Sequence, residues 1–270
     1  MKDELVAQME AIKQKRVRLE RHAVIVQRLR KLTSVILAAR AALPKRTVAD
    51  EDKPRCRDLA MMLEVRRAIE APNDVEVTEE TLQAVVQMLP TLEERWKRER
   101  RAELVQILRE GGVDAQDGAD ALDLVTAVFK CKECSRFMHH PQVLMHQCRN
   151  KPGVYDTAEY QYAEYYKCVY DAFGCKRTWV QSDFCVAPKL ERVRALVELC
   201  GKDPGVATLA DMDAAGIKLV HDEPSSGACV MSWRRAVSAI YIARPVPASS
   251  KVLTRTSVDR VCAQKPPRGL

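Results

Sequence analysis

Apolar residues recur with helical spacing over the first 43 residues. One register repeats every seven positions (Leu5, Ile12, Leu19, Val26), and a second continues it (Leu29, Ile36, Leu43). This pattern predicts one long helix over 2–43 that ends before Pro44. Gln8, Lys15 and His22 stand where a coiled-coil seam favours apolar side chains. Both a coiled coil and an amphipathic helix packed on the body therefore stay open.

After a charged linker at 44–53, the middle of the chain also has helical periodicity. We predict helices over 54–71, 78–89, 91–109 and 119–128. Pro90 is expected to separate the second from the third, because proline has no backbone N–H to donate within a helix. Thr91 and Glu94 have the spacing of a capping box, which supports a new helix start there.

From Phe129 onwards, Cys, His, Tyr and Trp become frequent. We expect an irregular α+β region over 129–241, with helices near 156–171 and 188–200. Residues 242–270 are rich in Pro, Ser, Lys and Arg and are predicted to be a disordered tail. The expected fold is mainly α, with a basic long helix at 1–46, a helical region at 54–128, and a small metal-stabilised α+β region.

Charge and cysteine content narrow the classes of function. The chain has a net charge of +7, and residues 1–46 hold twelve Lys/Arg against four Asp/Glu. A basic arm of this kind is suited to nucleic acid or to an acidic partner. The sequence shows no signal peptide and no apolar stretch long enough to span a membrane, which predicts a cytoplasmic or nuclear protein. Thiols are reduced there, so the ten cysteines favour a metal over disulfides.

Four residues have the spacing of a metal site, C-x2-C-x11-H-x-C: Cys131, Cys134, His146 and Cys148. A C-x2-C pair directs two sulfurs at one point, and zinc takes four such ligands in a tetrahedron. Pro141 is expected to start a short helix with His146 at its end. Cys148 must then lie beyond that helix, because residues two apart on a helix point in different directions. We predict one structural Zn²⁺ at this site.

Weaker signals have simpler interpretations. His139 and His140 are alternative third ligands, and His221 with Cys229 is a candidate for a second site. The remaining cysteines are expected to be buried free thiols, which is also the default for Cys229 (Cys168, Cys175, Cys185, Cys200, Cys229), or are left unassigned (Cys56, Cys262). Tyrosines spaced by four (Tyr162, Tyr166, Tyr170) predict a packed helix face, and Trp179 and Trp233 predict core anchors. No phosphate-binding loop or catalytic triad is evident, and Asp211 with Asp213 is interpreted as a turn or helix cap.

Several short motifs occur together in one order: Leu89-Pro-Thr-Leu-Glu-Glu-Arg-Trp96, Leu122-Asp-Leu-Val-Thr-Ala-Val-Phe129-Lys-Cys131, Pro141-Gln-Val-Leu-Met-His146-Gln-Cys148, Asp203-Pro204, Ala207-Thr208, Asp211-Met212-Asp213 and Met231-Ser-Trp233-Arg234-Arg-Ala-Val237. Over roughly 85–238, this order resembles the region downstream of the F-box in fungal F-box-type proteins. The resemblance implies a zinc-stabilised module and, for some relatives, substrate recognition in cullin-type ubiquitin ligases. The F-box itself is not recognised in this chain.

These observations predict a non-enzymatic, zinc-stabilised protein–protein interaction module of F-box-like type. A protein partner is expected, and neither a membrane nor a small-molecule substrate is. The alternative is a nucleic-acid-binding zinc-finger protein that contacts phosphate through residues 1–46.

Overall fold

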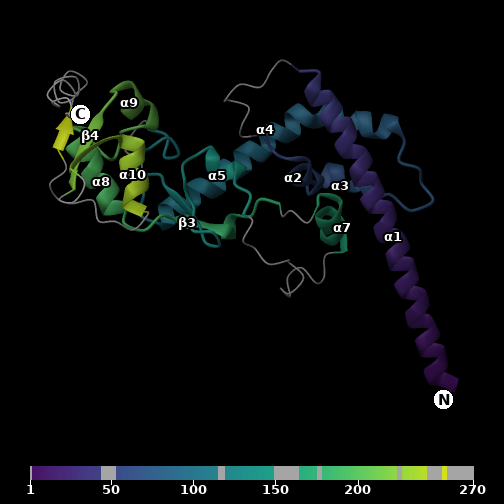
Figure 1. Ribbon diagram of the computed structural model, residues 1–270. Coiled ribbons are helices and arrows are strands. Elements are labelled where there is room, and N and C mark those ends of the chain that lie inside the picture. Colours follow the sequence, from purple (N-terminus) through teal and green to yellow (C-terminus); the bar gives the residue numbers. More distant parts are fainter. Residues whose placement is uncertain are drawn as a thin grey trace, which may run out of the picture. The chain divides into compact units, whose positions relative to one another are not determined.

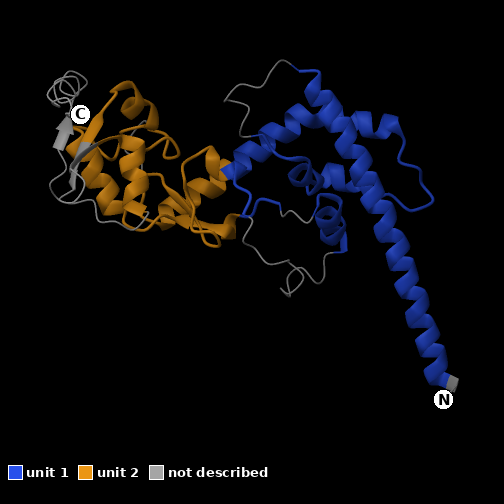
Figure 2. Cartoon of the chain, viewed as in Figure 1, with its two compact units in different colours: residues 1–100, 144–180 blue, residues 101–143, 181–270 orange. Residues whose placement is uncertain are grey.

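The computed structural model describes residues 2–43, 53–114, 119–148, 164–174, 178–223, 227–241 and 251–253. Two compact units form, each from two stretches of chain: unit 1 from 1–100 and 144–180, unit 2 from 101–143 and 181–270 (Figure 2). These boundaries differ from the four segments expected along the sequence. The predicted fold class is confirmed. The chain is mainly α, with a long N-terminal helix, a helical middle, and small sheets beside a Cys/His cluster in the C-terminal half (Figure 1).

In unit 1, the predicted N-terminal helix is present as α1 (Lys2–Ala41). Its two halves differ in burial. Residues 3–20 are exposed on every side, whereas Ile25, Leu29, Leu32 and Ile36 are buried. These four recur at intervals of four and three, so they form one apolar stripe. The second half of α1 packs against α2 (Cys56–Ala60), α3 (Leu63–Ile69) and α7 (Glu164–Ala172).

The predicted single helix over 54–71 is divided into α2 and α3. Met62 separates them in an extended conformation, with φ −72° and ψ 140°. Because the chain changes direction there, Leu59, Met62 and Val65 are all buried. Tyr165 of α7 donates a hydrogen bond from its hydroxyl to the carbonyl oxygen of Ala60, over 2.8 Å. That bond satisfies a backbone group at the end of α2.

The break predicted at Pro90 is wrong. A single helix, α4 (Glu79–Glu110), runs through it, and Thr91 and Glu94 lie in its interior instead of capping a start. One stripe of buried side chains continues across the proline: Leu82, Val85, Leu89, Leu92 and Trp96. Each large side chain contributes roughly 1.5–3 kcal/mol on burial. Together they outweigh the cost of an interior proline, about 3 kcal/mol.

Unit 2 contains a three-stranded antiparallel sheet with β1 (Phe129–Cys131) between β2 (Phe137–Met138) and β3 (Phe184–Val186). A short 3₁₀ turn, η3 (Gln181–Asp183), precedes β3. The helix predicted over 119–128 does not form, and the described residues 119–128 make turns. Residues 124–128 are buried in succession, which no single helix face allows. Their backbone bonds instead to a distant segment, with the N–H of Val125 donating to the carbonyl of Ala207 over 3.0 Å.

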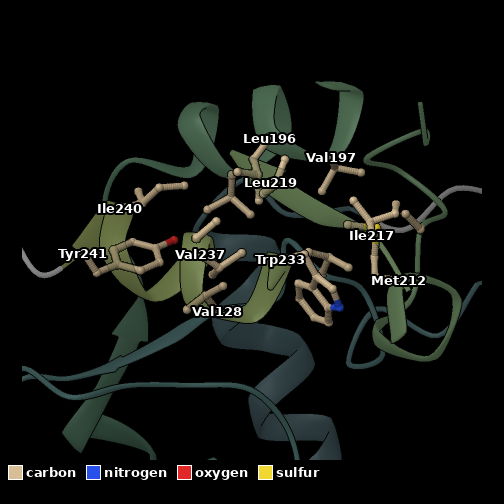
Figure 3. Close-up of a cluster of buried hydrophobic side chains, with 14 of the residues drawn as sticks. Val128, Leu196, Val197, Met212, Ile217, Leu219, Trp233, Val237, Ile240 and Tyr241 are labelled. Atoms are coloured by element: carbon tan, nitrogen blue, oxygen red, sulfur yellow. The ribbon is translucent and has the colours of Figure 1, made fainter. Parts of the chain in front are cut away.

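The second sheet of unit 2 consists of β4 (Lys218–Glu223) between β5 (Gly227–Ser232) and β6 (Lys251–Leu253). Three helices accompany it: α8 (Leu190–Leu199), which agrees with the helix predicted near 188–200, α9 (Leu209–Ala214) and α10 (Trp233–Tyr241). Figure 3 shows side chains of these helices gathered with Leu219 of β4 in one apolar cluster. Tyr241 also stacks on Phe137 of β2, with ring centroids 4.2 Å apart.

The C-terminal tail differs in part from expectation. Residues 242–250 and 254–270 lie outside the described residues. Lys251–Leu253 were expected to be disordered, yet they form β6 and pair with Lys218–Val220 of β4. Beyond its pairing with β5, β4 offers unpaired backbone groups along its other edge, and β6 pairs there.

Gly111, at the end of α4, yields a prediction about packing in unit 2. A Cβ at Gly111 would overlap the Cγ2 and Cβ atoms of Val186 in β3. We expect Gly111→Ala to lower the free energy of unfolding by about 1–3 kcal/mol, measured by urea denaturation. Adding Val186→Ala to Gly111→Ala should restore part of that loss, because it removes the overlapping methyl groups. Equal losses in the single and double variants would contradict this packing.

Candidate metal centre

The first two candidate ligands lie on a tight turn between β1 and β2. Cys131 ends β1, and residues 132–134 turn the chain back. The N–H of Cys131 donates to the carbonyl of Arg136 over 3.0 Å, and the N–H of Ser135 donates to the carbonyl of Cys131 over 2.9 Å. Ser135 has a left-handed backbone, with φ 56°, which lets the chain reverse directly after Cys134. Backbone hydrogen bonds therefore hold both thiols on one rigid knuckle.

The second pair follows the short helix α5 (Gln142–Met145), which begins directly after Pro141 as predicted. His146 and Cys148 both lie beyond its end. They are therefore free of the helical geometry that would direct them apart. The N–H of Val143 donates to the carbonyl of His139 over 3.1 Å at the start of this helix.

The structure brings the four predicted ligands together. The donor atoms of Cys131, Cys134, His146 and Cys148 all lie within 4.8 Å of one another. Ligands about 2.3 Å from a tetrahedral metal lie roughly 3.8 Å apart, so a small contraction would close the site around an ion. Cys131 is buried and the other three are half-buried. The four side chains could hold a metal ion.

Basic residues border this cluster. Lys130 is half-buried, and Lys132 and Arg136 are exposed on the same hairpin. Three thiolates around one divalent cation would leave a net charge of −1, which nearby cations offset. Arg149 and Lys151, which follow the cluster in the sequence, lie outside the described residues.

The alternative histidine ligands are not members of the cluster. The Nε2 atom of His139 lies 3.0 Å from the carbonyl oxygen of Val125, to which it donates. Burial lowers the pKa of His139, and nearby Arg234 adds to this effect. The imidazole is thus held neutral and committed to the backbone. His140 is also outside the group of four.

Of the cysteines predicted to be buried thiols, Cys168 is buried, whereas Cys185 and Cys200 are only half-buried. Burial raises the pKa of Cys168 to about 11, with Asp171 and Glu164 adding to it, so this thiol stays protonated at neutral pH. Burial also raises the pKa of Cys200. Cys185 donates a weak hydrogen bond to the carbonyl of Lys130, with sulfur and oxygen 3.8 Å apart. Cys56 is buried.

For the suggested second metal site at His221 and Cys229, the structure gives only the position of the backbone. The two residues are direct partners in the β4–β5 ladder. Cys175 and Cys262 lie outside the described residues. Within the ranges that the structure describes, the group around Cys131 is the one set of three or more His, Cys, Asp or Glu side chains close enough to share an ion.

Arg55 is a residue that sequence reasoning missed. Its guanidinium donates to the carbonyl oxygen of Met145. With the Gln147 amide oriented to satisfy its neighbours, the guanidinium also donates to that side-chain oxygen. Arg55 thus holds both residues that flank His146. No spacing rule relates residues 90 positions apart, so only the folded chain reveals this contact.

The carboxylates at Asp211 and Asp213 have structural partners. Thr208 caps α9, and Asp211 completes a capping box by accepting the N–H of Thr208 over 3.0 Å. The hydrogen bond from the Thr208 hydroxyl lowers the pKa of Asp211. Asp213 accepts hydrogen bonds from Arg234 and from the indole of Trp233, and Arg234 is the main cause of its lowered pKa. The expected cap is confirmed for Asp211.

Two further predictions concern aromatic residues. Tyr166 and Tyr170 are buried on α7, as a packed helix face requires, and Tyr162 lies outside the described residues. Trp233 is buried in the core of unit 2, whereas Trp179 is only half-buried. Trp179 instead lies under the guanidinium of Arg100, 5.2 Å from the ring centroid.

A second constellation lies on α1 and α7. The Nε2 atom of His22 is 2.9 Å from a carboxylate oxygen of Asp171. His22 and Cys168 both line a cavity of about 300 Å³. A Cys–His pair acts as a nucleophile only when the thiol ionises readily, and the raised pKa of Cys168 opposes this.

Comparison of the chain with protein-family models, with curated proteins and with solved structures gave no match. Among the described residues, no helix is both long enough and apolar enough to cross a bilayer.

Proposed function

We propose that this chain is a non-enzymatic protein–protein interaction module stabilised by one structural zinc ion. The observation that carries the proposal is the convergence of Cys131, Cys134, His146 and Cys148 within 4.8 Å. Three soft sulfurs and one imidazole nitrogen gathered within this distance are the donor set that zinc prefers. Hard cations such as Mg²⁺ or Ca²⁺ select oxygen ligands instead.

The structural role follows from the number of ligands. Four protein ligands fill a tetrahedral zinc ion and leave no position for water or substrate. A zinc hydrolase would need such an open position and a general base beside it. The paired carboxylates that the sequence singled out, Asp211 and Asp213, are engaged in a helix cap and an ion pair. These features support a scaffold rather than a catalyst.

The partner class follows from the resemblance to fungal F-box-type proteins. We infer a substrate-recognition role in a cullin-type ubiquitin ligase, with the zinc module shaping the interaction surface. The test is capture of the purified linker protein of such ligases by the purified full chain. The wild-type chain should bind the linker protein. A folded variant that no longer binds it would identify the surface that contacts the linker protein. A folded wild-type chain that fails to bind the linker protein would overturn the adaptor role.

A nucleic-acid interface is the second candidate, favoured by one observation. Lys13, Lys15, Arg16 and Arg18 are all exposed on the first half of α1. Binding through them should weaken steeply with salt, because phosphate contacts release counterions. Changing these four residues to glutamine should abolish such binding and leave the fold intact. Deleting 1–46 is a poorer test, since it would also remove the buried half of α1.

A further inference from the structure

The first half of α1 carries large apolar side chains that are exposed to solvent. At its end it approaches α7, where Leu19 lines a shared cavity and Arg18 lies 3.6 Å from Glu164. Residues 3–20 are exposed on all faces. Met9 and Ile12 have 64% and 68% of their surface exposed, and the other large apolar residues of this stretch are similarly open (Leu5, Val6, Val17, Leu19). Figure 1 shows this half of α1 extending beyond the helices that cover its second half. In proteins, most helical stability comes from packing of an apolar face, which this stretch lacks in the described chain.

Part of this apolar surface lies in a single seam. Leu5, Ile12 and Leu19 recur at seven-residue spacing, and Met9 lies between the first two. Arg16 occupies the equivalent place between Ile12 and Leu19. The spacing between these five residues alternates between four and three. This spacing places them on the face that one helix presents to another in a coiled coil (Leu5, Met9, Ile12, Arg16, Leu19). Val17 lies off this seam.

Charge along the same stretch is divided into two blocks. Residues 3–10 hold three carboxylates and no base, whereas residues 11–18 hold four bases and no carboxylate. The helix dipole favours acidic residues in the first turn, where Asp3 and Glu4 lie. It gives no reason for a basic block in the middle of a helix of 40 residues. A second helix with the opposite order of charge would complement both blocks.

We propose that residues 3–19 of α1 pair with the same residues of a second copy of this chain as an antiparallel helical dimer. Antiparallel pairing places each acidic block beside the basic block of the other copy. With residue 3 opposite residue 18, Met9 faces Ile12 of the second copy, and Leu5 faces the aliphatic stem of Arg16. Parallel pairing would instead set Arg16 against Arg16 inside the seam, which is repulsive. This inference goes beyond the proposed function and does not depend on the metal.

Sedimentation equilibrium of the full chain from about 1 to about 100 μM tests the dimer, since these concentrations cover a modest affinity. We expect wild-type protein to pass from monomer to dimer, and Ile12→Gln to shift the dissociation constant upward at least tenfold. Val17→Gln is the matched control, because Val17 is equally exposed, at 56%, but lies off the seam. It should dimerise like the wild type. Both substitutions are at exposed positions and leave the core intact.

The dependence of the dissociation constant on salt distinguishes an antiparallel from a parallel dimer. Attraction between opposite blocks weakens as salt is added, so the antiparallel dimer should dissociate further. Repulsion between like blocks would be screened, so a parallel dimer would strengthen. A monomer at every concentration, an equal effect of Ile12→Gln and Val17→Gln, or strengthening by salt would each overturn the proposal. An occupant of another kind, whether protein or nucleic acid, would leave the purified chain monomeric.

Discussion

Replacing Cys131 and Cys134 with serine is expected to abolish metal binding and to unfold the segment from β1 to Cys148. Serine keeps the size of cysteine but is a poor zinc ligand. Structural zinc sites in small modules contribute roughly 10–16 kcal/mol of apparent binding free energy at neutral pH. This is comparable to the whole stability of a domain. The loss should therefore be among the largest that any pair of substitutions in this chain can produce.

Amide hydrogen exchange measures this loss locally. The N–H groups of Cys131, Ser135 and Val143 are hydrogen-bonded in and beside the knuckle. They should be protected in the wild type and exchange rapidly in the double variant. Cys200→Ser is the matched control, because Cys200 is a half-buried thiol outside the cluster. Protection that is the same in all three proteins would contradict a structural role for the metal.

Arg28→Ala is expected to destabilise unit 1 strongly. Arg28 is 6% exposed, and its guanidinium donates to the carbonyl oxygens of Ile69, Pro72 and Val75 over 3.0, 2.9 and 2.6 Å. It also donates to Ala71. Burial lowers the pKa of Arg28, and the charge of Arg21 adds to this. Removing the side chain leaves several carbonyls in the turn after α3 without this donor.

The expected loss is about 3 kcal/mol, because the buried carbonyl of Ile69 loses its donor and hydrogen bonds to a charged group contribute roughly 1.5–3 kcal/mol. The urea midpoint of unit 1 measures this loss, with hydrogen exchange of the α3 amides as the signal for unfolding. Arg30→Ala is the control, since Arg30 is an exposed arginine on the same helix, and it should change stability little. Arg28→Lys should recover only part of the loss, because an ammonium group cannot reach as many diverging carbonyls. Equal urea midpoints for Arg28→Ala and Arg30→Ala would show that the hydrogen bonds of Arg28 do not stabilise unit 1.

Local sequence patterns predicted α1, α8 and the metal cluster. The α1 helix follows from its apolar spacing, and α8 from a similar pattern. The four ligands were found because C-x2-C and H-x-C are short, and each pair is close in space whenever its own turn forms. Cys148 also had to lie beyond a helix, and α5 ends early enough to allow this.

Long-range packing explains where the sequence interpretation was wrong. Pro90 looked like a helix end, but the stripe from Leu82 to Trp96 is buried on both sides of it. The expected helix at 119–128 is lost because Val125 bonds to Ala207, which no local pattern encodes. Arg55 and Arg28 act through contacts with residues far along the chain. Their arginine side chains look like ordinary surface charge until the fold is known.

Metal content of the purified full chain tests the central claim most directly. Native mass spectrometry should show one zinc ion per chain, removed by a strong chelator together with the protection of the Cys131–Cys148 segment, and both restored on adding zinc. A chain that keeps this segment folded without any bound metal, before and after chelation, would contradict the account.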